Sequence, residues 1–383
     1  MSENHRTGSG ASPAPLAGAA RLEIDLGAIV ANWRLLCAKH TPGAVGAVVK
    51  ANAYGLGAAE IVPRLHTAGC RHFFTAHLEE ALALRPLLPD RSMLAALNGL
   101  LPVDAGAYRA HGITPVLGSV AEIALWRAEA ARAEKKLDAI LHIDTGMARL
   151  GLTSGEVAAL AADPDLLAGI SLRYLMTHLV SAECRDDPLN EHQLVRFADA
   201  AARLPKAARS LANSSGIFLG PRFVSDLARP GAALYGINPT PDQPNPMYPA
   251  VRLSAQVLAL REVEKGTTIG YNETWRAAAP SRIATIGVGY ADGWPRSLSN
   301  RGSAVFDGRR LPLVGRVSMD LTTFDATGHP GLRPGDWLEL IGPGQPLEDV
   351  AAVAGTNAYE ILTALGARYQ RVERDDRMSE SRD

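Results

Sequence analysis

The segment AVVKANAYGLGA, residues 47–58, places a lysine, Lys50, directly after a short apolar run, and a tyrosine, Tyr54, just before a glycine. A lysine at such a place is either a surface charge that closes a buried strand or an amine held against a group with which it reacts. Burial lowers the pKa of an amine and so favours covalent bonding to a carbonyl compound. The hydroxyl of Tyr54, in a glycine-flanked loop, is suited to bind a phosphate.

A second group of polar residues lies farther along the chain, in the segment DLARPGAALYG, residues 226–236. Arg229 is followed there by a turn at Gly231 and Ala232, whose backbone amides are candidate phosphate ligands. Loops after the last strands of a β/α barrel commonly form such a site. The two segments together supply a candidate reactive amine and a candidate phosphate site.

These residues must be positioned by a regular scaffold, and the pattern from about residue 21 to 245 predicts one. Short apolar runs alternate there with longer helical patterns, as in parallel strands joined by helices. The predicted strands cover residues 44–49, 72–76, 92–97, 113–117, 138–143, 171–177, 209–213 and 232–236. Eight such units predict an α/β fold with a closed (β/α)8 barrel. In such barrels the chemistry lies at the carboxyl ends of the strands, and the polar residues at or just beyond these ends are Lys50, Arg149, His178, Asn213 and Arg229.

A change of pattern near residue 245 predicts a second domain. The segment NPTPDQPNPMYP, residues 238–249, contains five prolines, which interrupt regular structure. Beyond it, short apolar runs separated by Gly, Pro and Asp turns predict a mostly antiparallel β domain over residues 246–383, with one helical stretch at 347–365. We expect residues 1–20 to form a flexible tail and residues 371–383 to form a solvated one.

The composition argues against several classes of partner. The chain has 39 Lys and Arg residues against 40 Asp and Glu residues, so no strong field attracts nucleic acid or an anionic membrane. Three widely spaced cysteines argue against a disulfide framework or a metal cluster. No apolar run approaches the ~18 residues of a membrane helix, and the N-terminal residues lack the apolar stretch of a secretory signal. We expect a cytoplasmic protein without a metal site.

Taken in order, the motifs of this chain resemble those of the pyridoxal-phosphate-dependent alanine racemases. The resemblance covers almost everything from about residue 21 to 370 and involves both domains. The matching motifs are AVVKANAYGLGA, HIDTGMARLG, LMTHLVSAE, LANSSG, ARPGAALYG, IGYNETWRA, TIGVGYADGWPR, GRVSMD and TNAYEI.

The resemblance implies a cofactor, pyridoxal 5'-phosphate, bonded covalently to Lys50. His178 would pack against the cofactor ring, and Arg149 would approach the phenolate oxygen and the substrate carboxylate. The residues implied on the phosphate side are Tyr54, Asn213, Ser214, Gly231, Ala232 and Tyr359. Singly, each has a structural alternative: His178 could be a core histidine and Ser214 a helix N-cap. Their order along one chain favours the cofactor site.

Arg229 indicates the type of reaction. A guanidinium group stays charged and can only donate hydrogen bonds, so it would bind an unprotonated ring nitrogen of the cofactor. A ring held in this way withdraws electrons weakly, which favours return of a proton over transamination or elimination. The alternative is a surface ion pair, against which the position of Arg229 at the predicted barrel mouth argues.

Racemisation requires an acid–base group on each face of the reacting carbon. The resemblance assigns Lys50 to the α-proton of D-alanine and Tyr271 to that of L-alanine. It also implies that Tyr271 and Met319 reach the site from the other subunit of a head-to-tail homodimer. Tyr290 and Tyr359 would narrow the entry and favour a small amino acid. The resulting prediction is interconversion of L- and D-alanine, which supplies or consumes D-alanine for peptidoglycan.

Three other functions compete with this prediction. A serine or broad-specificity racemase differs only in a few wall residues. A decarboxylase of related fold is disfavoured by Arg229 where an acidic residue would be expected. A pyridoxal-phosphate carrier without catalytic activity is disfavoured by the second domain.

Two positions depart from the pattern of the family. Many members have a lysine where this chain has His142, seven residues before Arg149, and its carbamylated form orients that arginine. Histidine forms no stable equivalent, so a water, a chloride or another side chain supports Arg149 here, or its orientation is looser. In GYNE, Asn272 follows Tyr271 where glycine is common. We expect activity to persist despite both departures.

Overall fold

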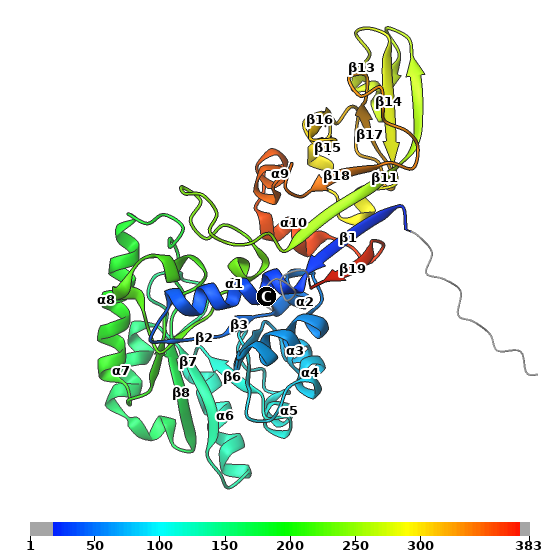
Figure 1. The fold of residues 1–383 in the computed structure, drawn as a ribbon. Coiled ribbons are helices and arrows are strands. Elements are labelled where there is room, and N and C mark those ends of the chain that lie inside the picture. Colours follow the sequence, from blue (N-terminus) through cyan, green and yellow to red (C-terminus); the bar gives the residue numbers. More distant parts are fainter. Residues whose placement is uncertain (1–17, 376–383) are drawn as a thin grey trace, which may run out of the picture.

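The computed structural model describes residues 18–375. Most of the predicted N-terminal tail, and the last residues of the predicted C-terminal tail, lie outside this part of the chain. Figure 1 shows two lobes, a barrel lobe and an elongated β lobe, joined where the N-terminal strand and the C-terminal helices meet. Within the described residues, none of the helices combines the length and the hydrophobicity needed to cross a membrane.

The barrel is a parallel sheet whose two ends are adjacent pieces of one chain segment. Its strand order is β2-β10-β9-β8-β7-β6-β5-β4-β3, and β2 and β3 are separated only by Gly46. A side chain on Gly46 would lie 2.9 Å from the carbonyl oxygen of His72, so glycine permits this close pairing. The strands are β2 (Ala44–Val45), β3 (Ala47–Val48), β4 (His72–Thr75), β5 (Met93–Ala96), β6 (Thr114–Leu117), β7 (Leu137–His142), β8 (Ile170–Met176), β9 (Ala208–Ser210) and β10 (Leu227–Ala228).

The prediction of the eighth strand at residues 232–236 is wrong. That segment forms a short 3-10 helix, η5 (Ala232–Tyr235), and the eighth strand is β10, which pairs with β2 and β9. The residues of η5 are apolar because the helix packs against α1 (Leu26–Lys39), and its Ala233, Leu234 and Tyr235 are fully buried. A short buried helix and a buried strand have the same apolar pattern. The other seven predicted strands overlap observed ones.

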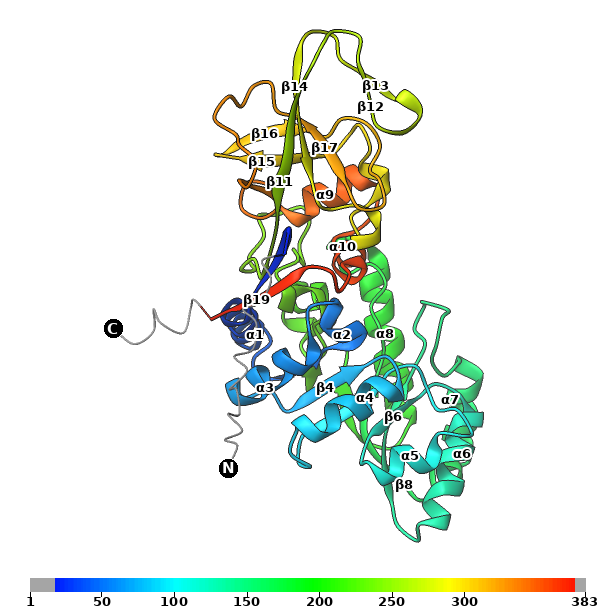
Figure 2. The same cartoon turned by 90° about the vertical axis from the view of Figure 1, so that its right-hand side faces the viewer.

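The helices of the barrel lobe surround the sheet (Figures 1 and 2). Several begin at a side chain that accepts a hydrogen bond from the first turn, such as Asp25 for α1 and Ser119 for α6. Besides α1, they are α2 (Lys50–Tyr54), α3 (Ala58–Ala68), α4 (Leu78–Leu84), α5 (Ala105–Ala110), α6 (Val120–Arg132), α7 (Ser154–Ala162) and α8 (Pro188–Arg203).

The β lobe is built from chain segments on both sides of the barrel. Strand β1 (Ala20–Asp25) pairs antiparallel with β11 (Val251–Val263) and parallel with β19 (Gln370–Arg374), so the barrel is inserted between strands of the second sheet. The predicted solvated tail therefore begins too early, because β19 includes Arg371–Arg374. The remaining strands are β12 (Thr268–Ile269), β13 (Trp275–Arg276), β14 (Ser281–Ile286), β15 (Ser303–Phe306), β16 (Arg309–Pro312), β17 (Thr322–Asp325) and β18 (Trp337–Ile341).

All pairs in this second sheet except β1 with β19 are antiparallel. The prediction of a (β/α)8 barrel followed by a mostly antiparallel β domain is confirmed. The helical stretch predicted at 347–365 forms two helices, α9 (Leu347–Ala354) and α10 (Ala358–Ala364), because Gly355 ends the first one with a positive φ of 76°. Helix α10 lies beside α2 at the junction of the two lobes (Figure 1).

The contact between α2 and α10 generates a prediction about two glycines. Gly55 and Gly57 both have positive φ, so alanine at either costs about 1 kcal/mol. A Cβ on Gly55 would also lie 2.5 Å from the carbonyl oxygen of Leu362 in α10, whereas one on Gly57 would meet nothing within 4 Å. We expect Gly55→Ala to lower the free energy of unfolding by about 1–3 kcal/mol more than Gly57→Ala. Urea unfolding of both variants measures this difference, and equal losses would contradict the contact.

Candidate active site

The turn that carries Lys50 has an uncommon backbone conformation. The four residues Ala51–Tyr54 have φ values of 52°, 54°, 53° and 57°, so they form a left-handed turn. Each such residue costs roughly 1–2 kcal/mol when it is not glycine. The turn is held by hydrogen bonds from Ala53 N to Val49 O (2.9 Å) and from Ala58 N to the side chain of Asn52 (2.9 Å). Strain of this kind occurs where the surrounding structure imposes it, and it marks Lys50 as a candidate functional residue.

The surroundings of Lys50 favour a neutral amine. Burial is the main cause that lowers the pKa of Lys50, and the positive charge of Arg149 adds to it. Glu80 acts in the opposite direction and raises this pKa. Arg149 is exposed and lies in the loop that follows β7. Its charge acts on Lys50, which follows β3, so the two residues approach each other from different strands of the barrel. Lys50 therefore combines a lowered pKa with a nearby guanidinium group.

His178 is half-buried and lies just after β8. The groups that act on its pKa show that several of the predicted site residues lie close together. Burial, together with four neighbouring basic groups, lowers its pKa to about 3. Those neighbours are Arg229, Arg149, His142 and Lys50, in order of decreasing effect. Barrel closure thus brings together basic residues that end or follow the strands β3, β7, β8 and β10, and the charge of the two arginines suits an anionic ligand.

Arg229 is buried but makes no ion pair within residues 18–375. Its guanidinium donates to the carbonyl oxygen of Thr177 (2.6 Å) and to the hydroxyl of Ser210. Burial lowers its pKa to about 10, so it stays protonated at neutral pH. The alternative of a surface ion pair is wrong, because the charge is held by neutral oxygens beneath the barrel mouth.

A small polar cradle lies next to Arg229. The Ser214 hydroxyl accepts hydrogen bonds from Gly231 N (3.1 Å) and Ala233 N (3.2 Å), on either side of Ala232. The hydroxyl of Tyr54 lies against Gly231, where any side chain would overlap it. Burial raises the pKa of Tyr54 to about 12, so this hydroxyl stays protonated and can donate.

Asn213 and Tyr359 border this cradle in different ways. Asn213 donates to Leu179 O (3.3 Å) and accepts from Gly216 N (2.9 Å), so it fixes the loop that carries Ser214. Tyr359 lies on α10 and acts electrostatically on Tyr54, while 38% of its surface is exposed. It therefore lies at the open side of the cradle.

Three predicted residues lie on the β lobe with much of their surface exposed. The exposed fractions of Tyr271, Tyr290 and Met319 are 68%, 43% and 53%. Tyr290 and Met319 belong to two turns joined by hydrogen bonds from Tyr290 N to Ser318 O (3.0 Å) and from Ala291 N to Met319 O (2.9 Å). Tyr271 lies between β12 and β13, at the end of the β lobe remote from α2 (Figures 1 and 2). One chain alone does not bring Tyr271 to Lys50.

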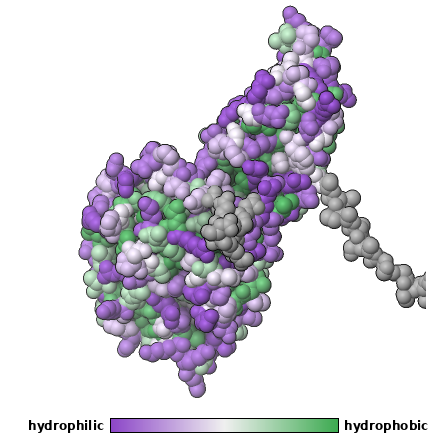
Figure 3. Space-filling model, viewed as in Figure 1, coloured by the Kyte–Doolittle hydropathy of each residue, from purple (hydrophilic) through white to green (hydrophobic). Residues whose placement is uncertain are grey.

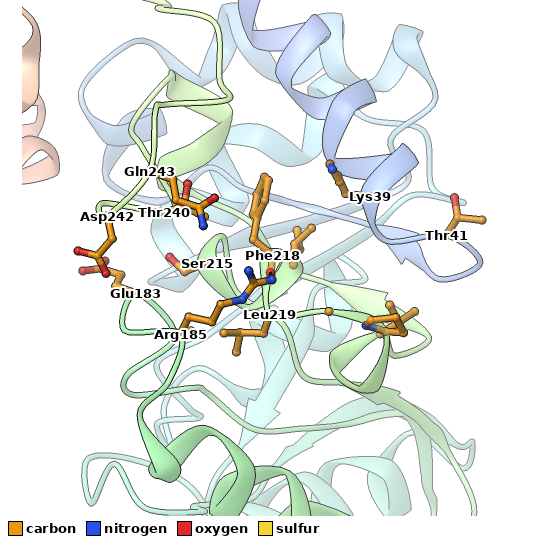
Figure 4. A pocket seen from close by; sticks show the side chains of 15 residues that line it. Lys39, Thr41, Glu183, Arg185, Ser215, Phe218, Leu219, Thr240, Asp242 and Gln243 are labelled. Carbon is orange, nitrogen blue, oxygen red and sulfur yellow. Dashed lines mark hydrogen bonds between the residues drawn. The ribbon is translucent and has the colours of Figure 1, made fainter.

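A separate cavity of about 400 Å³ adjoins the site without including Lys50. It lies behind the loop of Ser215 and Phe218, with side chains of both charges around it (Figure 4). Its charged lining residues are Lys39, Glu183, Arg185 and Asp242. Since Glu183 also acts on the pKa of Tyr359, the cavity borders the open side of the cradle.

Comparison with known proteins matches both lobes. Residues 24–239 fit the family model described as alanine racemase, N-terminal domain, and residues 250–373 fit the model of the alanine racemase C-terminal domain. The chain belongs to the alanine racemase family. It is 59% identical to the alanine racemase of Acidiphilium cryptum over 351 residues, which cover 92% of this chain and 98% of that protein. The predictions of this family and of an amino-acid isomerase are confirmed.

Solved structures of alanine racemases agree with this assignment. The enzyme of Bartonella henselae is 45% identical, covers 92% of this chain and 99% of its own, and superimposes with a TM-score of 0.90. It was solved with covalently bound pyridoxal phosphate, the cofactor predicted here from the sequence. The biosynthetic alanine racemase of Pseudomonas aeruginosa, at 35% identity and the same coverage of this chain, has a TM-score of 0.86.

Sequence reasoning missed three residues that organise the site: Glu80, Thr177 and Ser210. Thr177 and Ser210 hold Arg229, and their only signal was position: Thr177 ends one predicted strand and Ser210 lies near the start of the next. Glu80 bonds to the backbone of the Lys50 turn, and its signal was the pattern of a helix start, with Glu80 in the first turn of α4.

The buried His142 generates a prediction about acid stability. Burial, followed by the charge of Arg229, lowers its pKa from 6.5 to about 4. Because the folded pKa is the lower one, the neutral imidazole stabilises the fold fully above pH 6.5, and this stability is lost as the pH falls toward 4. Between pH 7 and pH 5 we expect cofactor-free protein to lose about 2 kcal/mol more than His142→Asn does. Urea unfolding at both pH values measures this, with exposed His111→Asn as the control. Equal losses in wild type and His142→Asn would contradict it.

Proposed function

We propose that this protein interconverts L- and D-alanine with pyridoxal 5'-phosphate bound at Lys50. The observation that carries the proposal is the gathering of Lys50, Arg149, His178 and Arg229 at the carboxyl ends of the barrel strands, with no carboxylate paired to Arg229 within residues 18–375. When bound, the cofactor supplies an electron-withdrawing ring that makes the α-proton of an amino acid acidic.

The residues present fit this cofactor. In the cradle, the Ser214 hydroxyl accepts from Gly231 N and Ala233 N and keeps its own proton to donate, the Ala232 amide lies between these two, and the Tyr54 hydroxyl lies against Gly231 as a further donor. Such donors suit a phosphate. Tyr359 would complete this side, and Asn213 would keep the loop in place. The cationic cluster matches the negative charge of the phosphate and the phenolate oxygen.

The roles around the ring follow from charge and donors. Arg229, which can only donate, would bind an unprotonated ring nitrogen and limit electron withdrawal. Arg149 would bind the substrate carboxylate. His178, whose pKa is lowered first by burial and then by its basic neighbours, would pack against the ring without adding charge. This arrangement favours a proton's return to the α-carbon, which is what racemisation requires.

Two bases would move the α-proton. The amine of Lys50, with its lowered pKa, is suited to exchange a proton on one face, that of D-alanine. The phenolic oxygen of Tyr271 would serve the other face, that of L-alanine. Since Tyr271 lies remote from Lys50 in one chain, it must come from a second copy.

A head-to-tail homodimer would bury two surfaces that are exposed in one chain, the barrel rim and part of the β lobe. Large apolar side chains are exposed on the barrel rim and on the β lobe, and hydrophobic residues reach the surface of both lobes in Figure 3. They are Leu150 and Val180 on the rim, and Tyr271, Tyr290, Met319 and Leu321 on the β lobe. Exposed apolar patches commonly mark protein interfaces. Met319 would then contribute to the partner's substrate site, and Tyr290 from one chain with Tyr359 from the other would narrow the entry.

A narrow entry favours alanine over larger amino acids, and the product D-alanine would serve peptidoglycan. Serine differs from alanine by one hydroxyl, which apolar walls reject only weakly, so a serine or broad-specificity racemase is the second candidate. Parallel assays with alanine and serine separate the two.

The reaction is tested with purified, cofactor-loaded protein and L-alanine in deuterated water. We expect α-proton exchange and formation of D-alanine together, because the removed proton mixes with solvent at the base. Tyr271→Phe should abolish the conversion of L-alanine, whereas the matched control Tyr248→Phe should retain it. Bound cofactor without D-alanine would exclude the proposed reaction.

The shared site is tested by mixing two inactive variants, Lys50→Ala and Tyr271→Phe, after dissociation and reassociation. In a mixed dimer one site has lost both groups, but the other keeps Lys50 from one chain and Tyr271 from its partner. We therefore expect activity to return to about a quarter of the wild-type value in a random equal mixture, since half of the dimers regain one of two sites. A mixture as inactive as its parents would show that each site uses a single chain.

A further inference from the structure

Three glutamates of the barrel lobe share one arrangement. Glu80, Glu122 and Glu156 are each the third residue of a barrel helix, α4, α6 and α7. Each carboxylate accepts a hydrogen bond from a backbone amide of its own loop and another from a neighbouring loop. For Glu156 the two donors are Thr153 N (2.9 Å) and Val120 N (3.1 Å). These glutamates therefore tie adjacent loops at the catalytic rim of the barrel.

Glu80 makes this connection to the turn of Lys50. One of its oxygens accepts from Ala76 N (2.8 Å) and His77 N (3.2 Å), in its own loop after β4. The other accepts from Ala51 N (2.5 Å), the residue directly after Lys50 and the first of the left-handed turn. Glu80 thus fixes the start of a backbone segment whose left-handed conformation costs free energy.

The charges around Lys50 come from several elements. Arg149 follows β7, His142 ends β7, His178 follows β8 and Arg229 follows β10, and all of these groups are basic. Asp144 lies near His142, but its carboxylate binds the amides of Gly146, Met147 and Ala148. The carboxylate that acts on Lys50 is that of Glu80, from α4.

We propose that Glu80 is a positioning residue for Lys50, which it orients through the amide of Ala51 and to which it presents the negative charge that offsets the surrounding cations. The proposal rests on the proposed role of Lys50. An amine that alternately gives and takes a proton requires both states to be accessible. Arg149 alone would favour the neutral amine, and Glu80 restores part of the charged form.

Glu156 supplies a matched control. It has the same helix position and the same two-loop bonding, but the residue that it holds, Val120, is not next to a lysine. Glu80→Gln keeps the size of the side chain and removes its charge. Glu156→Gln makes the same change at a carboxylate that does not bond to the turn of Lys50.

The test measures the reactivity of the Lys50 amine in the full-length protein after the cofactor has been removed. Competitive labelling with acetic anhydride over pH 6–11, read by peptide mass spectrometry, gives the midpoint pH of Lys50, with Lys39 as an internal reference. We expect Glu80→Gln to lower this midpoint by about 0.5–1 pH unit, a modest shift because the pair is partly solvated. Glu156→Gln should leave it unchanged. An unchanged midpoint in Glu80→Gln would overturn the proposal.

A second measurement covers the positional role and the case in which Glu80→Gln does not fold. Glu80→Asp keeps the charge but is one methylene shorter, so it should lose the bond to Ala51 N. Hydrogen–deuterium exchange should then be at least threefold faster in a peptide spanning residues 50–54 than in the wild type. Equal exchange in the two proteins would overturn the positional role.

A separate arm distinguishes failure of this proposal from failure of the proposed function. Wild-type protein is loaded with pyridoxal phosphate, reduced with borohydride and digested. Cofactor mass on the Lys50 peptide supports the proposed function, and its absence overturns that function. The labelling midpoint still decides whether Glu80 acts on Lys50.

Discussion

A backbone hydrogen bond from Val48 N to Pro230 O, 2.9 Å long, closes the barrel at the point on which the site depends. It continues the pairing of β2 with β10, so the segment ending in Lys50 lies beside the segment that carries Arg229 and Gly231. The hydroxyl of Tyr235 adds a second link by donating to Val48 O (2.9 Å). Without this closure, the amine and the phosphate cradle would lie on opposite edges of an open sheet.

The same closure concentrates positive charge, which costs stability in the absence of an anion. The structure limits this cost by keeping His142 and His178 neutral and by giving Arg229 two neutral oxygen acceptors. The left-handed turn after Lys50 adds backbone strain to the same place. An anionic cofactor that binds only the folded chain would offset both costs, because binding to the native state stabilises it.

How far the sequence predicts this arrangement depends on the range of each interaction. Seven barrel strands follow from local apolar runs, but the segment 232–236 was misread because its burial comes from packing on α1. Lys50 and Arg229 were found from motifs, whereas Glu80 was not, since a glutamate in a first helical turn normally signals only a cap. In the proposed dimer, the approach of Tyr271 to Lys50 depends on a second chain, which no local pattern encodes.

In the proposed dimer, the insertion of the barrel between β1 and β11 would allow one chain to serve two sites. Helix α10 carries Tyr359 at the mouth of its own barrel, and the residues just after it hold the exposed turns of the β lobe. Gly366 N donates to Asp292 O (3.0 Å), and Arg368 pairs with both Asp292 and Asp320. Asp292 ends the turn of Tyr290, and Asp320 follows Met319. The surface that the proposed dimer would bury is therefore connected through one short helix to the entrance of the chain's own site, so the geometry of both proposed sites would depend on the same junction.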